Sequence, residues 1–67
     1  MNDKMIPAAG QYWTVLRGSS NANGKGVYIM GNHPNSHLMF VCFCFELEKE
    51  LLIHKSDFLL GYLEFVG

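Results

Sequence analysis

Apolar and polar residues alternate along much of this chain, and the alternation predicts short β-strands. In the stretch QYWTVLR (11–17), Trp13 and Val15 are expected on one face and Tyr12 and Thr14 on the other, because side chains alternate along a strand. Aromatic and β-branched residues, which favour strands, are abundant in this stretch. The composition of GSSNANGKG, with its Asn-Gly pair, predicts a loop and a turn into a second strand.

Turn-forming residues divide the rest of the chain into further short segments. The segment GNHPNSH (31–37) contains Gly, Asn and Pro and is expected to form a loop. A turn at Glu48 and Lys49 is expected to separate a third strand from a fourth. The segment KSDFLLG is expected to form one short helical turn, with Ser56 as its candidate N-cap. The strands that follow from these divisions are 27–30, 38–47, 50–54 and 62–66.

The second half of the chain also fits a helical pattern. The segment ELEKELL consists of strong helix formers. Side chains recur there at spacings of three or four, as on one face of a helix: Leu47, Leu51, His54, Phe58 and Tyr62. Two pairs of poor helix formers, at 53–54 and 56–57, and the glycine at 61 weigh against a continuous helix. The alternative to strands is an α+β fold, an antiparallel sheet with one helix at about 46–63.

Two stretches carry a resemblance to a known fold. The opening GQYWTVLRG and the closing LLIHKSDFLLGYLEFV resemble the ends of small SH3-like and tudor-like domains, in which a short helical turn precedes the last strand. The resemblance implies an all-β fold, a five-stranded SH3-like barrel with a short helical turn before the last strand. We therefore expect a short N-terminal tail over 1–9 and a single small barrel domain over 10–67. The small size and Asn-rich loops are similar in style to accessory proteins that phages carry against host defences.

Composition and charge narrow the classes of function. The chain has 67 residues, of which 49% are apolar and 16% charged, and its formal net charge is −1. Its five Lys and Arg residues form no cluster along the sequence, so direct nucleic-acid binding is not expected, because such binding depends on neutralising phosphates. The longest uncharged apolar run is about eight residues, whereas a membrane-spanning helix needs about 20. No signal peptide is recognisable, and the expectation is a cytoplasmic protein without membrane contact.

The sequence contains no recognisable catalytic or metal-binding motif. Cys42 and Cys44 lie two residues apart in an expected strand, about 6.6 Å along the backbone, which is too far for a disulfide. Metal sites commonly use a C-x₂-C spacing, and His33 and His37 flank a proline that prevents a helical pair of ligands. We expect no catalytic, cofactor-binding or metal-binding residues, and the chain is not expected to be an enzyme.

The third expected strand has two apolar faces. One face carries Phe40, Cys42 and Cys44, and the other carries Val41 and Phe43 among its residues. A single curved sheet covers only one face of a strand, so the second face needs another cover. We expect a homodimer or partner interface in this region, with Phe40, Cys42 and Cys44 as the possible oligomer interface.

Three glutamates occupy alternate positions from the end of this strand onward. If the chain is extended there, the carboxylates share one face and could meet a basic partner surface. With the tyrosines, which are enriched in interface cores, they make up the expected partner-binding residues: Tyr12, Tyr28, Glu46, Glu48, Glu50 and Tyr62.

These observations lead to a functional hypothesis with two alternatives. The hypothesis is a non-enzymatic protein-binding module, such as a phage or mobile-element inhibitor that binds a host defence complex, for example a CRISPR effector. The first alternative is a nucleic-acid-associated adaptor of tudor or KOW type, with a basic face assembled from Arg17, Lys25, Lys49 and Lys55. The second is a small metal- or thiol-dependent enzyme.

Overall fold

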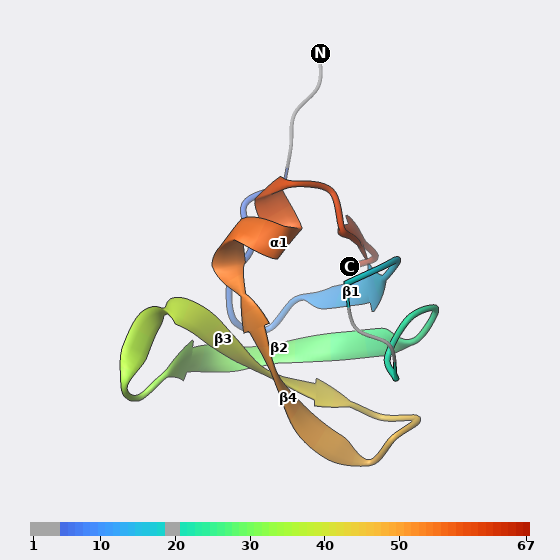
Figure 1. The fold of residues 1–67 in the computed structure, drawn as a ribbon, viewed down its shortest axis with the longest axis horizontal. Helices are drawn as coiled ribbons and strands as arrows, with labels where there is room; N and C mark the ends of the chain where they lie inside the picture. The colour runs from blue at the N-terminus through green and yellow to red at the C-terminus, as the bar shows by residue number, and fades with distance from the viewer. Residues whose placement is uncertain (1–4, 19–20) are drawn as a thin grey trace.

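A computed structural model describes residues 5–18 and 21–67, which form one antiparallel sheet and one short helix. The sheet has five strands in the spatial order β4-β3-β2-β1-β5 (Figure 1). The elements along the chain are β1 (Tyr12–Val15), β2 (Gly26–His33), β3 (Ser36–Cys44), β4 (Lys49–His54), α1 (Lys55–Leu59) and β5 (Leu63–Phe65). The fold is therefore rich in β-structure, as the alternating sequence pattern predicted.

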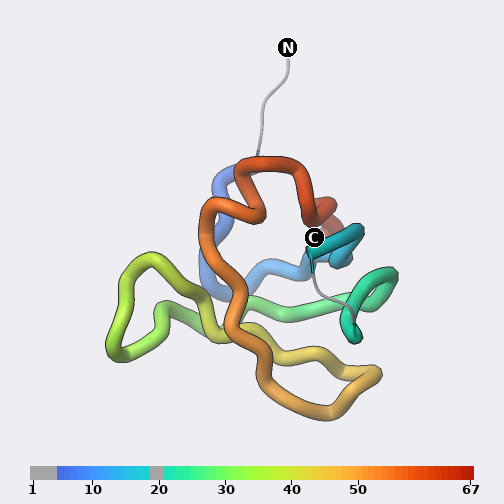
Figure 2. The backbone as a smooth tube through the Cα atoms, in the orientation of Figure 1, coloured from blue at the N-terminus to red at the C-terminus, as the bar shows by residue number. Residues whose placement is uncertain are grey.

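The helix shows that the sheet is curled. β4 and β5 are the two outermost strands, yet α1 contacts both of them and also β3. Figure 2 shows the chain rising from the end of β4 into α1 and returning to a C-terminal segment beside β1. A flat sheet would hold its two edges far apart, so the strands must coil around the helix. Within the described residues β4 pairs only with β3 and β5 only with β1, so both edges stay unpaired.

The core lies on the concave side of this sheet, beneath α1. Phe58 of α1 packs edge-to-face against Trp13 of β1 at 5.0 Å and against Phe40 of β3 at 5.6 Å between ring centroids. Such aromatic pairs contribute about 0.5–1.5 kcal/mol each beyond their buried area. The indole Nε1 of Trp13 donates a hydrogen bond to Oε1 of Gln11 at 2.9 Å, so its polar atom is satisfied. The remaining buried residues are Val15, Ala22, Val27, Ile29, Cys42, Cys44, Ile53 and Leu63.

The helical alternative for residues 46–63 is wrong. Six of these residues form β4, and α1 is five residues long. The N-cap of α1 is His54, whose Nδ1 accepts a hydrogen bond from the backbone N–H of Ser56 at 3.2 Å, so the expectation that Ser56 is the cap is also wrong. Gly61, at φ 86°, ends the helical segment in a conformation that suits glycine. No helix within the described ranges is long and apolar enough to cross a membrane.

The turn between β1 and β2 agrees with the sequence. The backbone N–H of Lys25 donates to the carbonyl of Ala22 at 2.9 Å, which places the Asn-Gly pair at the centre of a four-residue turn. Gly24 has φ 82°, as the third residue of a type II turn requires. The N–H of Gly24 also donates to the carbonyl of Val15 at 2.6 Å, so this turn is tied directly to the end of β1.

The loop expected over 31–37 is mostly strand instead. β2 continues to His33 and β3 begins at Ser36, so only Pro34 and Asn35 form the turn. The ladder accommodates the glycine and asparagine through register shifts after Ile29 and before His33. Proline lacks a backbone N–H and is tolerated at the turn, where the ladder needs no donor. The glycine, asparagine and proline of this segment therefore bend the hairpin without ending its strands early.

The three glutamates do not share one strand face. β3 ends at Cys44, and the segment 45–48 forms a turn in which the N–H of Glu48 donates to the carbonyl of Phe45 at 3.2 Å. Glu48 has φ 56°, a left-handed conformation that ends the alternation of an extended chain. Glu46 and Glu48 lie in this turn, and only Glu50 lies in β4.

Candidate functional site

The structure decides which apolar face of β3 is inside. The side chains of Phe40, Cys42 and Cys44 are buried, with exposures of 6%, 0% and 0%. They are therefore part of the chain's own core, and the folded chain offers no surface there for the oligomer interface expected at these residues. Side chains alternate along β3, so Val41 and Phe43 lie on the opposite, convex side.

The convex side carries a row of residues that runs across four strands. Tyr12 of β1 is opposite Tyr28 of β2, Tyr28 is opposite Phe43 of β3, and Phe43 is opposite Glu50 of β4. Residues directly opposite in antiparallel strands have side chains on the same face. The sheet thus places on one surface three aromatic residues that are far apart in the sequence.

A fourth aromatic residue joins this row from the turn after β3. The ring of Phe45 lies 5.1 Å from that of Phe43 and 6.3 Å from that of Tyr12, between centroids. The rings of Tyr12 and Tyr28 are 4.9 Å apart. Tyr12 is 46% exposed and Phe45 is 54% exposed, so the group is open to solvent. We call Tyr12, Tyr28, Phe43 and Phe45 the aromatic face.

Carboxylates surround the aromatic face. Glu50 ends the row on β4. Thr14 of β1 faces outward, because its neighbours Trp13 and Val15 face the core. Glu64 of β5 is opposite Thr14 and therefore lies on the same outward side. Glu46 and Glu48 lie in the turn that follows Phe45. All four glutamates are exposed.

The cations of the described residues lie away from the aromatic face. The guanidinium of Arg17 is 4.9 Å from the ring centroid of Tyr62, and Nζ of Lys55 is 4.8 Å from that of Phe40. Lys49 is opposite Cys44 and therefore extends from the concave side, and Lys25 lies in the turn before β2. The face is apolar at its centre and negative at its border.

The partner-binding residues expected from the sequence are divided by the fold. Tyr12, Tyr28 and Glu50 share the row, and Glu46 and Glu48 lie beside its end. Tyr62 is elsewhere, half-buried against the core under Arg17.

Two members of the aromatic face, Phe43 and Phe45, were not among the partner-binding residues expected from the sequence. Phe43 was expected on the face of β3 opposite to the cysteines, and this alternation was the available signal. Only the pairing with Tyr28 shows that this face is continuous with the tyrosines.

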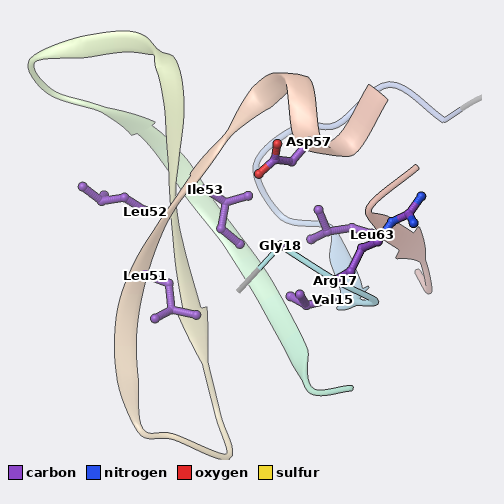
Figure 3. A pocket seen from close by; sticks show the side chains of 8 residues that line it. All are labelled: Val15, Arg17, Gly18, Leu51, Leu52, Ile53, Asp57 and Leu63. Atoms are coloured by element: carbon purple, nitrogen blue, oxygen red, sulfur yellow. The ribbon is translucent and has the colours of Figure 1, made fainter. Parts of the chain in front are cut away.

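A second feature is a cleft between β4 and the end of β1 (Figure 3). Its volume is about 120 Å³. Ile53 of β4 faces Val15 and Leu63 across it, and Asp57 of α1 lies at one end. The remaining lining residues are Arg17, Gly18, Leu51 and Leu52.

The cysteine thiols and two of the imidazoles are engaged within the fold, by burial or by hydrogen bonds. Both cysteines are free, and burial raises the pKa of the Cys42 thiol to about 12, so this thiol is protonated at neutral pH and is a poor nucleophile. Nδ1 of His33 accepts a hydrogen bond from the N–H of Asn35 at 3.1 Å, and His54 caps α1. Across 5–18 and 21–67, no three His, Cys, Asp or Glu side chains are grouped so that they could hold a metal ion.

No family model matches this sequence, and no curated protein or solved structure matches it either.

Proposed function

We propose that this chain is a non-enzymatic protein-binding module that contacts its partner through the aromatic face. The observation that supports this proposal is a cluster of exposed rings with a border of carboxylates and without a cation among the described residues on that face. Contiguous exposed apolar surface on a small domain commonly marks an interaction site. Tyrosine and phenylalanine are enriched in interface cores, where each ring buries a large area with little loss of side-chain entropy.

The size of the molecule is compatible with one interface of ordinary size on this side. A standard interface takes about 800 Å² from each partner, roughly a fifth of the 4323 Å² accessible surface of this chain. The aromatic face would form the centre of that area and the glutamates its rim. Val41 and Leu52, which are opposite each other on β3 and β4, extend the apolar centre.

The charge pattern favours a basic partner. Carboxylates at a rim speed the association with a positive surface and select against negative ones. A second copy of this chain is disfavoured at the same face, because a two-fold contact would bring the same glutamates toward each other. We therefore propose a different protein, with an apolar pocket or patch bordered by Lys and Arg, as the partner.

The nucleic-acid adaptor remains the competing function, because exposed rings on a sheet can stack bases. It is less well supported, since the glutamates would repel phosphates. Lys49 and Lys55 lie at opposite ends of β4, about 20 Å apart at a rise of ~3.3 Å per residue. Arg17 and Lys55 are also engaged with aromatic rings.

We propose an SH3-like fold and a defence-inhibitor role as the narrower form of this function. The strand order β4-β3-β2-β1-β5, with a short helix before the last strand, supports the SH3-like assignment. A phage- or mobile-element-encoded inhibitor would cover a basic surface of a host defence complex such as a CRISPR effector. Effectors of this type hold nucleic acid in positively charged channels, to which an acidic border is complementary.

The test is a comparison of partner capture by three forms of the protein. The wild type and a control, Leu60→Ser, should enrich the same partner from a host lysate, because Leu60 is exposed at the end of α1, away from the aromatic face. The double variant Tyr12→Ser/Phe45→Ser should lose this partner by at least tenfold while keeping the wild-type circular dichroism spectrum. Equal capture by all three forms would refute the proposal.

A binding assay with nucleic acid separates the two functions. Fluorescence anisotropy with labelled single-stranded and duplex RNA and DNA at low salt should show no binding at micromolar protein. Micromolar binding that weakens with added salt and is lost in the double variant would favour the adaptor instead.

A further inference from the structure

The cleft along β4 is unusual in the residues of that strand that line it. Leu51, Leu52 and Ile53 are consecutive residues of β4, and all three line the cleft. Side chains alternate between the two faces of a strand, so a cleft on one face would meet only alternate residues. A cleft lined by three consecutive residues touches the backbone of the strand as well as its side chains, as a cleft along the strand edge does.

Among the described residues, the backbone of this edge has no pairing partner. β4 is the outermost strand, and its register connects it to β3 alone. Outside the strand ladders, no backbone hydrogen bond between described residues involves positions 49–54. Alternate residues of an edge strand point their N–H and C=O groups away from the sheet, and these groups form a template for another strand. The segment from Leu51 to Ile53 has no charged residue that would discourage such pairing.

The cleft adds a side-chain site to this edge. Its inner surface comes from Ile53, Val15 and Leu63, which are buried at 8%, 2% and 5% exposure (Figure 3). A cavity of about 150 Å³ holds a benzene molecule, so a cleft of about 120 Å³ has room for one aliphatic side chain. An extended segment beside β4 would direct alternate side chains toward it.

The end of the cleft at α1 carries a carboxylate. Asp57 is half-buried there, in the first turn of α1, and its carboxylate forms no hydrogen bond or ion pair with another described residue. Arg17 also lines the cleft, but its guanidinium lies over the ring of Tyr62. A lysine or arginine of a bound segment could therefore approach Asp57 without displacing a partner among the described residues.

We propose that the free edge of β4 binds an extended segment of another protein by strand addition. Backbone groups of the segment pair with β4, one aliphatic side chain fills the cleft, and a basic side chain two positions away reaches Asp57. The occupant is an extended chain because only a strand presents donors and acceptors at the spacing that an open edge requires. This site is separate from the aromatic face and does not depend on the function proposed for it.

The experiment uses two short probe peptides, acetyl-KTLTT-amide and acetyl-TTLTK-amide, which carry the lysine on either side of a central leucine. Each is titrated into isotope-labelled protein and followed by amide chemical shifts. At least one peptide should bind and shift residues 50–54, Gly18 and Asp57, with no shift at Tyr12 or Phe43. No binding at millimolar peptide, or shifts centred on the aromatic face, would overturn the proposal.

Backbone methylation of the peptide tests strand addition directly. Alternate N–H groups of an added strand face its partner, so N-methylation in one register should weaken binding at least tenfold. N-methylation in the other register should leave the affinity within twofold. Equal affinity of both methylated forms would show that the peptide is held by side chains alone and would refute pairing with β4.

A matched pair of protein variants tests the role of Asp57. Asp57→Asn should weaken the lysine peptide at least threefold and leave the same peptide with norleucine in place of lysine unchanged. The control Glu64→Gln removes a carboxylate from the convex side and should change neither affinity. A similar loss in both variants would refute the assigned role of Asp57, and thermal unfolding of each variant checks that the fold is retained.

Discussion

Two phenylalanines on opposite sides of the sheet allow the assignment of inside and outside to be tested. Phe40, in β3, is 6% exposed and packs against Phe58, whereas Phe45, just after β3, is 54% exposed on the convex side. Replacing each of them by alanine is the same chemical change in two environments. We predict a large loss of stability for Phe40→Ala and a small one for Phe45→Ala.

The magnitudes follow from burial. Truncation of a buried phenylalanine to alanine costs about 3–5 kcal/mol, and Phe40→Ala also removes the contact of its ring with Nζ of Lys55. A phenylalanine with more than half of its surface exposed contributes ~1 kcal/mol by burial. A domain of this length has a total stability of roughly 3–10 kcal/mol, at ~0.05–0.15 kcal/mol per residue. Phe40→Ala should therefore lose between about a third and all of the stability, and Phe45→Ala should remain folded.

The assay can use the tryptophan of the chain itself. Trp13 is the single tryptophan, is 4% exposed and lies 5.0 Å from the ring of Phe58, so its fluorescence reports the packing of the core. Guanidinium titration of the three proteins gives the two differences in the free energy of unfolding. A loss for Phe45→Ala equal to that for Phe40→Ala would refute the reasoning, since it would mean that the convex side is buried. Light scattering at two concentrations would then show whether a second copy covers it.

Three further predictions concern the turn, the thiol and the helix cap. Gly24→Ala should lower the free energy of unfolding by about 1 kcal/mol, because φ at Gly24 is 82°, whereas Gly67→Ala at the C-terminus should change it little; equal effects would contradict this view of the turn. Since burial raises the pKa of Cys42 from 9.0 to about 12, the unfolded chain releases this proton first as the pH rises. The contribution of Cys42 to stability should therefore fall between pH 9 and 12, by up to about 1.4 kcal/mol per pH unit, and a Cys42→Ala variant should show a shallower decline in chemical denaturation than the wild type. His54→Ala should destabilise the protein by ~1 kcal/mol through loss of the cap, and His54→Asn should restore most of it in thermal unfolding; no difference between the two would exclude a capping role.

The two proposed sites lie on different parts of one small sheet. The aromatic face is on the convex side of β1, β2 and β3, and the cleft runs along the edge of β4. Glu50 and Leu52 are the β4 residues whose side chains share the convex side, so a partner that added a strand to β4 would extend that surface. Variants at Tyr12 and Phe45 are expected to leave peptide binding at β4 unchanged, which keeps the tests of the two sites independent.

Much of the local structure could be predicted from the sequence. The alternation around Trp13 and Val15, the Asn-Gly turn and the short helical segment before the last strand are all confirmed. Each depends on interactions between residues a few positions apart, which the local sequence describes. The loop expected over 31–37 was wrong because pairing between β2 and β3 prevailed over the loop preference of the individual residues, so residues 31–33 belong to β2.

The sequence by itself determined that β3 has two apolar faces, but only the tertiary structure decided which of them is exposed. Both faces satisfy the same local pattern, and the choice depends on the direction in which the sheet curls and on the side that α1 covers. That curl buries Phe40, Cys42 and Cys44 and brings Phe43 into line with Tyr12 and Tyr28. The sequence also determined that glutamates occupy alternate positions from 46 to 50. The left-handed conformation at Glu48 decided that they border the aromatic face instead of forming a stripe along one strand. Side-chain alternation is a local property of an extended chain, whereas exposure depends on contacts between strands distant in the sequence, and this is why the surface could not be derived from the pattern alone.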